Sequence, residues 1–212
     1  MKTIAVMNQK GGAGKSTLAV HIATAAFLAG KPTVILDMDQ QGTAEAWFSW
    51  RQEKQHKEDP AVIGAKAATL PRWLGEVQKK GAQLAVIDTP PLAEGQAIKA
   101  AQSADLILIP CRPSGFDIHA MSLTADLAKT TGKPAYVVFN AGPPRKASIY
   151  DEAAEAMTAL GVALAPVRVS ERSVFKLAVT AGQSVQEMEP HGKAAAEIAA
   201  LWLWLAQTLR LK

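Results

Sequence analysis

The stretch Lys10-Gly11-Gly12-Ala13-Gly14-Lys15-Ser16-Thr17 carries residue types that bind phosphate groups. Glycines let the backbone adopt positive φ, so several N–H groups can point toward one anion. Lys15 supplies a mobile positive charge for the β- and γ-phosphates of a nucleotide, and Ser16 offers a hydroxyl to a magnesium ion. The stretch therefore predicts a loop that binds the phosphates of a nucleotide together with Mg²⁺.

The residues on either side of this loop supply the context that phosphate-binding loops need. An apolar run over residues 3–7 predicts a buried strand before the loop, and apolar residues recur at helical spacing over residues 15–29 after it. The start of that helix adds unpaired N–H donors and the positive end of the helix dipole. A glycine-rich turn without a ligand is the alternative, and the order strand, glycine turn, helix weighs against it.

Lys10 distinguishes this loop from the general pattern G-x-x-x-x-G-K-[ST], because Gln9 stands at the first glycine position. The form Lys-Gly-Gly-x-Gly-Lys-[Ser/Thr] resembles the deviant Walker A motif of the MinD–ParA family. That family includes ParA-type partition ATPases, MinD, the nitrogenase iron protein and the arsenite-pump ATPase. The resemblance covers nearly the whole chain and implies that Lys10 reaches across a homodimer interface to the partner's nucleotide. It also implies that nucleotide binds to Gly11, Gly12, Ala13, Gly14, Lys15, Ser16 and Thr17.

Carboxylates follow two further apolar runs, at the strand ends where open α/β sheets place their ligands. Asp37 and Asp39 belong to the stretch Asp37-Met38-Asp39-Gln40-Gln41-Gly42, and Asp88 ends the run over residues 84–87. By resemblance to the family, Asp39 orients or activates the attacking water and Asp37 lies near the magnesium shell. Asp88 resembles a Walker B carboxylate, which holds magnesium through a bound water. Solvated turn carboxylates, or a helix cap in the case of Asp88, are the alternatives.

These motifs give a predicted set of site residues. Lys10, Lys15 and Asp39 are the predicted catalytic residues, and Ser16, Asp37 and Asp88 are the predicted metal ligands. Gln40 departs from the family's second motif, where proline is usual, so we expect a somewhat less rigid loop there.

Asn140 ends another apolar run, residues 134–139. In the family an asparagine at this strand end reads the adenine edge, so Asn140 is the predicted base contact; a turn former is the alternative. Residues 169–176 and 182–185 resemble the family's late segment near the base. Residues 111–118 resemble the loop before its interfacial helix, and there Arg112 faces either the dimer interface or solvent.

Apolar runs alternate with helical patterns along the chain, which predicts a three-layer α/β fold. We expect a mostly parallel, twisted sheet with helices on both faces, and a single P-loop ATPase domain over residues 1–212. Further strands are expected at 105–110, 134–140 and 162–167. Further helices are expected at 43–59, near 70–74, at 148–160 and at 193–212.

Composition excludes several classes of protein. Apolar residues make up 49% of the chain and charged residues 20%, which is typical of a globular protein. The lone cysteine, Cys111, excludes a disulfide framework and an iron–sulfur cluster bridging two subunits, which weighs against the nitrogenase branch. The start resembles no signal peptide, and no apolar run approaches the ~20 residues of a membrane span, so we expect a cytoplasmic protein.

Charge gives only weak evidence for a nucleic-acid partner. The net charge is +4, and residues 141–212 hold 8 basic against 7 acidic side chains. A DNA-binding face would therefore have to be assembled in three dimensions. Scattered surface charge is the alternative. The candidates for such a face are Arg145, Lys146, Arg168, Arg172 and Lys176.

The last predicted helix has an apolar face made by Ile198, Leu201, Leu205 and Leu209. MinD-like relatives use a terminal amphipathic helix to bind membranes. Such helices usually carry several basic residues, whereas here only Arg210 and Lys212 lie near the end. Packing against the sheet is therefore the favoured interpretation, and we expect no membrane partner.

The resemblance is strongest to small, ParF-like partition ATPases, and a first strand at residue 3 implies the form without an N-terminal DNA-binding extension. It implies a slow, Mg²⁺-dependent ATPase for DNA segregation that forms a nucleotide-sandwich homodimer. The dimer would bind DNA without sequence preference, associate with the nucleoid, and be switched by a centromere-binding ParB/ParG-like partner. Alternatives are a membrane-cycling ATPase like MinD, a positioning ATPase for a protein cargo, and a synthetase or kinase.

Overall fold

The computed structural model describes residues 1–56, 59–91, 94–145 and 147–211. Its strands are β1 (Lys2–Val6), β2 (Thr33–Asp37), β3 (Ala61–Gly64), β4 (Leu84–Asp88), β5 (Leu106–Cys111), β6 (Ala135–Gly142), β7 (Ala163–Leu164) and β8 (Val169–Ser170). They form one sheet in the order β3-β2-β4-β1-β5-β6-β7, with β8 pairing with β6 off this path. Every pairing is parallel.

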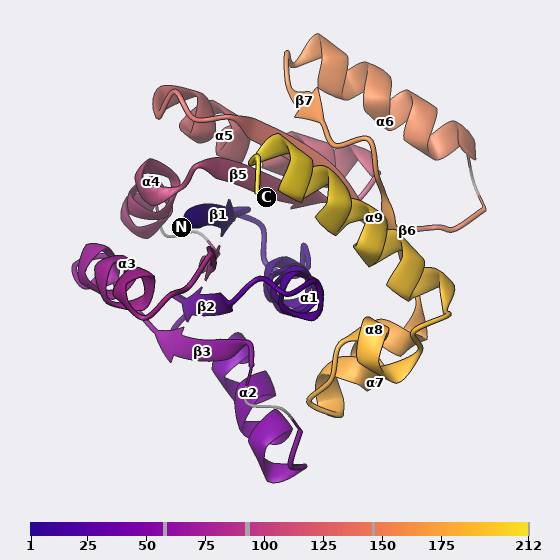
Figure 1. Cartoon of the computed structure of the whole chain (residues 1–212). Coiled ribbons are helices and arrows are strands. Elements are labelled where there is room, and N and C mark those ends of the chain that lie inside the picture. Colours follow the sequence, from indigo (N-terminus) through magenta and orange to yellow (C-terminus); the bar gives the residue numbers. More distant parts are fainter. Residues whose placement is uncertain (57–58, 92–93, 146, 212) are drawn as a thin grey trace.

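The helices are α1 (Lys15–Leu28), α2 (Thr43–Glu53), α3 (Leu70–Lys79), α4 (Glu94–Ser103), α5 (Gly115–Thr130), α6 (Ala147–Ala159), α7 (Ser173–Thr180), α8 (Val185–Met188) and α9 (Lys193–Thr208). They cover the two faces of the sheet (Figure 1). Helices α1, α2, α7, α8 and α9 pack on one face, and α3, α4, α5 and α6 on the other. The predicted three-layer α/β fold is therefore confirmed.

The central strands are apolar on both faces because helices cover both sides of the sheet. All residues of β2, β4 and β5 are buried. The register sets the strand ends level, because Asp88 pairs with Val6 on one side and with Asp37 on the other. This pairing gathers the ends of three strands beside the start of α1.

Several predicted elements differ from the observed ones at the edges of the sheet. The helix expected at 43–59 ends at Glu53, and residues 61–64 form the edge strand β3, which the sequence did not reveal. The strand expected at 162–167 is reduced to Ala163–Leu164. Edge strands are short and only half-buried, so their apolar signal is weak and pairing with the neighbouring strand decides them.

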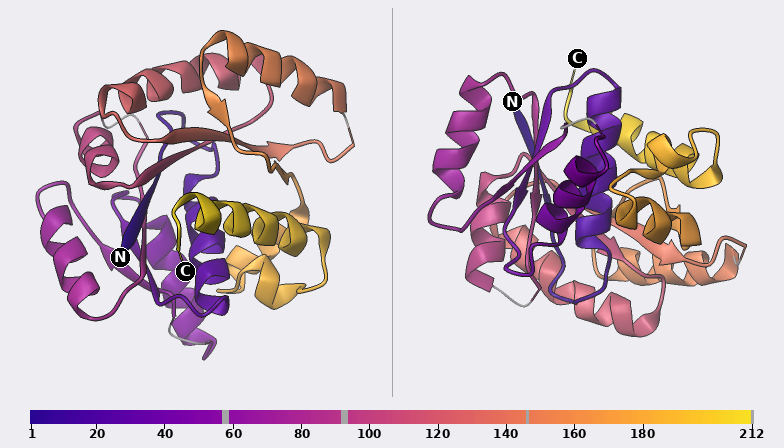
Figure 2. Two further views of the ribbon diagram at one scale, coloured as in Figure 1. Left: turned by 45° about the horizontal axis from the view of Figure 1, so that its top comes forward. Right: turned by 90° about the horizontal axis from the view of Figure 1, so that it is seen from below.

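The apolar face of α9 is buried within the molecule. Ile198, Leu201, Leu205 and Leu209 belong to the same core cluster as α1 residues, while Leu203 is exposed. This packing agrees with the favoured interpretation of the helix. Among the described residues, none of the helices combines the length and the apolar character needed to span a membrane. Lys2 and Arg210 line one hollow, so the beginning and the end of the described chain lie close together (Figure 2).

Candidate functional site

The phosphate-binding loop joins β1 to α1, as the sequence predicts. Gly12 and Gly14 adopt positive φ of 73° and 90°, and Gly14 caps α1 without a side-chain hydrogen bond. The N–H groups at the start of α1 therefore remain available to an anion. The Lys15 side chain is buried beneath the loop and donates to the Lys10 carbonyl oxygen at 3.4 Å. Burial lowers the pKa of Lys15, while Asp88 and Asp39 act in the opposite direction.

Asp88 is fully buried, and neither carboxylate oxygen has a hydrogen-bond partner among the described residues. Burial raises its pKa to about 7; the nearby Ser16 hydroxyl lowers it and Asp37 raises it further. A buried carboxylate without hydrogen-bond partners is energetically costly, and a bound cation would compensate its charge. The residues present therefore fit Mg²⁺, which takes one or two protein ligands and keeps its waters. A cluster of three or more acidic, histidine or cysteine ligands does not occur in the described part of the chain.

Asp37 organises the loop that carries Asp39. Its Oδ1 accepts from the Asp39 N–H at 2.9 Å, and its Oδ2 accepts from the Ala44 and Glu45 N–H groups at 3.0 and 3.2 Å. Burial raises the pKa of Asp37 above its usual value, although these hydrogen bonds offset part of the rise. Both Asp37 oxygens already accept hydrogen bonds from the backbone, at Asp39 and at the start of α2. The predicted place of Asp37 near the metal stays a prediction. Asp39 lies at the end of β2 as expected, and its Oδ1 accepts from the Gln41 N–H at 3.0 Å.

Lys10 forms an ion pair within its own chain. Its Nζ lies 2.8 Å from Asp117 Oδ1 in the first turn of α5, and its N–H donates to Asn8 Oδ1. Partial burial would raise the pKa of Asp117, but hydrogen bonds from Lys10 and Ser114 outweigh it and lower the pKa. The predicted contact of Lys10 with a second subunit stays a prediction. Such a contact requires this ion pair to break.

A hollow of about 280 Å³ opens beside the loop, where the base of a nucleotide is expected. Asn140 borders it and donates from Nδ2 to the Ala13 carbonyl oxygen at 2.8 Å. Residues 170–172 and 175–176 also line the hollow, as the resemblance of residues 169–176 implies. Arg112, which the sequence left between interface and solvent, lines it too. The contact of Asn140 with adenine stays a prediction.

Three of the basic side chains predicted to face DNA lie around two hollows that share Arg172. Arg145 and Arg172 line a second hollow, of about 570 Å³, together with Lys193. Arg172 also pairs with Glu197 at 2.7 Å, which neutralises part of its charge. The Arg168 guanidinium stacks over the Tyr150 ring at 4.3 Å. Lys176 faces the base-side hollow, and Lys146 lies outside the described residues.

Sequence reasoning missed Asp117 and Ser114. The Ser114 hydroxyl accepts from the Asp117 N–H and donates to its carboxylate, and this caps α5. The spacing Ser-x-x-Asp before a helical pattern is a capping signal, so the start of the helix was detectable. The partner of that carboxylate, Lys10, lies more than a hundred residues earlier, and no local pattern reveals it.

Comparisons with known proteins extend over nearly the whole chain. The family described as "CobQ/CobB/MinD/ParA nucleotide binding domain" matches residues 4–185. The "Maintenance of carboxysome distribution protein A" of Gloeobacter kilaueensis is 31% identical over 98% of this chain and 94% of its own length. Both matches agree with the resemblance to the MinD–ParA family that the deviant Walker A motif indicates.

Two solved structures share the fold. The structure of an ATP complex of a variant McdA from Cyanothece covers all of this chain, with a TM-score of 0.78, 15% identity and 97% of its own chain covered. MinD complexed with Mg-ADP from Pyrococcus horikoshii covers 98% of this chain and 96% of its own, with a TM-score of 0.75 and 16% identity. At the level of the family, the predictions of an ATPase and of ATP with Mg²⁺ are confirmed. The chain belongs to the MinD/ParA family of deviant Walker A ATPases, within the CobQ/CobB/MinD/ParA nucleotide-binding group.

Proposed function

We propose that this protein is an ATPase that positions a cargo in the cell by cycling between an ATP-bound dimer and a nucleotide-free or ADP-bound monomer. Residues 1–212 would act as one ATPase domain. The observation that carries the proposal is the glycine loop with two lysines, Lys10 and Lys15, on a chain that matches a protein named for carboxysome distribution over nearly its full length.

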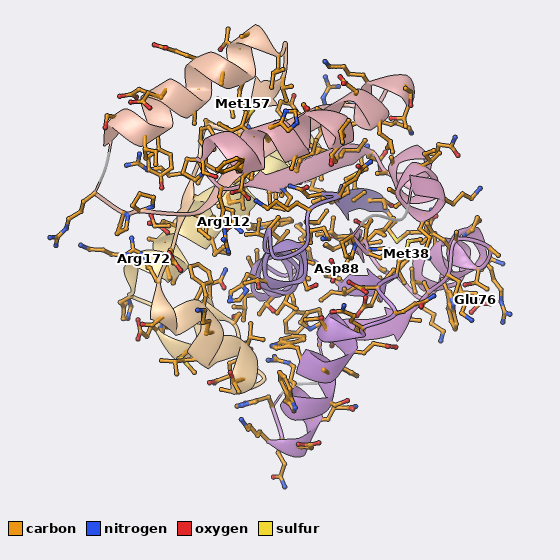
Figure 3. The ribbon with its side chains drawn as sticks, turned by 180° about the vertical axis from the view of Figure 1, so that it is seen from behind. Met38, Glu76, Asp88, Arg112, Met157 and Arg172 are labelled. Atoms are coloured by element: carbon orange, nitrogen blue, oxygen red, sulfur yellow. The ribbon has the colours of Figure 1, made fainter. Side chains whose placement is uncertain are left out.

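The proposed roles of the site residues follow from their places. Residues 11–17 bind the phosphates through backbone N–H groups, and the Lys15 ammonium neutralises their charge. Ser16 and Asp88 would hold Mg²⁺, which when bound neutralises charge that develops on the phosphate oxygens. Asp39, on the loop fixed by Asp37, orients a water for attack on the γ-phosphate. Figure 3 places Asp88 on one side of α1, and Arg112 with Arg172 on the other.

Dimerisation would make ATP a condition for the active state. Lys10 of each subunit would leave Asp117 and contact the nucleotide of the other subunit. A triphosphate offers more negative charge than one carboxylate, so this exchange favours the dimer only when ATP is present. The two subunits would then hydrolyse ATP slowly until a partner protein stimulates the reaction.

A protein cargo is favoured over a plasmid or chromosome. A relative that matches 98% of this chain is named for maintaining carboxysome distribution, which supports the protein-cargo alternative of the sequence prediction more than its DNA-segregation reading. DNA would still serve as the matrix along which the ATP-bound dimer moves, with Arg145, Arg168 and Arg172 as candidate contacts. Such binding would weaken steeply with salt, because phosphate contacts release counterions.

Turnover and dimerisation of the purified protein test this proposal directly. We expect slow Mg²⁺-dependent hydrolysis, an ATP-dependent dimer by light scattering, and stronger DNA binding with ATP than with ADP. Lys15→Ala should abolish nucleotide binding. Lys10→Ala should keep nucleotide binding but lose the dimer, and Asp39→Ala should accumulate the ATP-bound dimer.

The choice between cargoes needs an experiment in the host cell. With Asp39→Ala in place of the wild-type gene, we expect a protein assembly to lose its regular spacing while plasmids and chromosomes are inherited normally. Loss of plasmids instead would return the assignment to DNA segregation. A Lys10→Ala protein that still dimerises with ATP would refute the dimer cycle itself.

A further inference from the structure

Two side chains hold neighbouring carbonyl oxygens of the phosphate-binding loop. Arg112 donates from Nη2 to the Gly12 oxygen at 3.2 Å, and Asn140 donates from Nδ2 to the Ala13 oxygen at 2.8 Å. Arg112 follows β5 and Asn140 lies on β6, so both donors come from parts of the chain at least 100 residues beyond the loop.

The sheet register explains why these two side chains act together. Cys111, the last residue of β5, pairs with Phe139 of β6, so the next residues along the chain, Arg112 and Asn140, stand at the same level beside the loop. The segment after Arg112 is fixed by close packing. At Gly142 the backbone lies against the Pro113 ring and the Tyr150 hydroxyl, and any side chain there would overlap them.

Holding these carbonyl oxygens also fixes the direction of two N–H groups. In a planar trans peptide the N–H points away from the C=O of the same unit. The Gly12 carbonyl shares its peptide with the Ala13 N–H, and the Ala13 carbonyl shares its peptide with the Gly14 N–H. Gly14 adopts φ of 90°, and a side chain at this position would collide with the Asn140 amide. The loop glycine and the asparagine therefore fit one another.

We propose that Arg112 is a positioning residue of the phosphate-binding loop, and that Asn140 shares this role in addition to any contact with adenine. The two donors keep the loop in its anion-binding geometry before the nucleotide arrives, so that binding does not have to order the loop. This inference rests on the nucleotide-binding part of the proposed function and is independent of the cargo.

A purely electrostatic role of Arg112 is the competing explanation. Arg112 and Lys176 line the same hollow, and each would attract a nucleotide through its charge. The two residues differ in one respect, because Arg112 has a hydrogen bond to the loop and no such bond joins Lys176 to residues 10–17 in the described structure. Lys176→Ala is therefore a matched control for Arg112→Ala, since each removes one positive charge from the same hollow.

Hydrogen–deuterium exchange of the nucleotide-free protein tests the positioning role without any ligand. We expect the peptide that contains residues 9–14 to exchange faster in Arg112→Ala and in Asn140→Asp, which replaces a donor by an acceptor. Exchange should match wild type in Lys176→Ala and be largely restored in Arg112→Lys. If Asn140 only contacted adenine and Arg112 only attracted the nucleotide, exchange would be unchanged in every variant. That result would overturn the proposal.

Binding and turnover provide the second readout. With Arg112→Ala we expect the Kd for ATP to rise by about tenfold, the loss of one charge-assisted hydrogen bond, and the kcat at saturating ATP to change by less than about threefold. Lys176→Ala should raise the Kd by less than about threefold. If the two variants lost the same affinity for ATP and the losses disappeared at high salt, the effect would be one of charge alone, and the inference would be refuted. Failure of the cargo proposal would leave these results untouched.

Discussion

Removing the carboxylate that holds Lys10 should make the ATP-dependent dimer stronger. In the monomer Lys10 Nζ lies 2.8 Å from Asp117 Oδ1, and the contact must break before Lys10 can reach a second subunit. Asp117→Asn removes the negative charge and keeps the backbone N–H that Ser114 caps. The substitution therefore releases Lys10 with little change to the start of α5.

The expected magnitude follows from the exposure of the two side chains. The Lys10 side chain is 36% exposed and that of Asp117 is 11% exposed, so solvent screens the attraction and the ion pair contributes about 1 kcal/mol. Each dimer breaks two such pairs. Asp117→Asn should then favour dimerisation by about 2 kcal/mol, which corresponds to about a thirtyfold larger association constant.

Analytical ultracentrifugation with a non-hydrolysable ATP analogue measures this constant. Asp126→Asn is the matched control, because Asp126 lies on the same helix and pairs with Lys129 on the exposed surface at 3.3 Å. We expect no change in that variant, and a smaller difference between Asp117→Asn and wild type at high salt. A dimer of unchanged or lower stability in Asp117→Asn would refute the reasoning, because it would mean that Asp117 does not compete for Lys10.

Four further predictions concern stability and are measured by urea unfolding in EDTA. Burial lowers the pKa of His21 to about 4, so the unfolded chain binds a proton that the folded chain rejects. The contribution of His21 to stability should therefore fall by about 2 kcal/mol from pH 7 to pH 5, and His21→Leu should remove this loss. Asp88, whose pKa is raised to about 7, acts in the opposite direction, because the folded chain keeps a proton that the unfolded chain releases. The contribution of Asp88 to stability should therefore fall as the pH rises from 4 to 7, and Asp88→Asn should abolish this pH dependence. Gly182→Ala should cost at least about 2 kcal/mol, since φ is 67° and the new Cβ would lie 2.5 Å from the backbone nitrogen of Arg51. Glu187→Gln should cost about 2 kcal/mol, because it removes the charge of a carboxylate that pairs with the fully buried Arg51 at 2.7 Å. Unchanged midpoints in the last two variants, or parallel pH curves in the first two, would contradict these assignments.

The α/β class and the position of the phosphate-binding loop could be predicted from the sequence. Both depend on local patterns, namely apolar runs of strand length, helical periodicity and the spacing of glycines and lysines over eight residues. The carboxylates Asp37 and Asp88 were found for the same reason, since each directly follows a buried run. The edge strand β3 was missed because its four residues, three half-buried and one exposed, give too weak a pattern without the neighbouring strand β2.

Contacts between distant parts of the chain could not be predicted in the same way. The pairing of Lys10 with Asp117, and the hold of Arg112 and Asn140 on the loop, join residues at least 100 positions apart. The sequence by itself determined that a nucleotide loop exists, because the loop's chemistry lies in one short stretch. Only the tertiary structure decided which side chains hold that loop and its signature lysine, because the order of the strands in the sheet, not their order in the chain, brings those groups together.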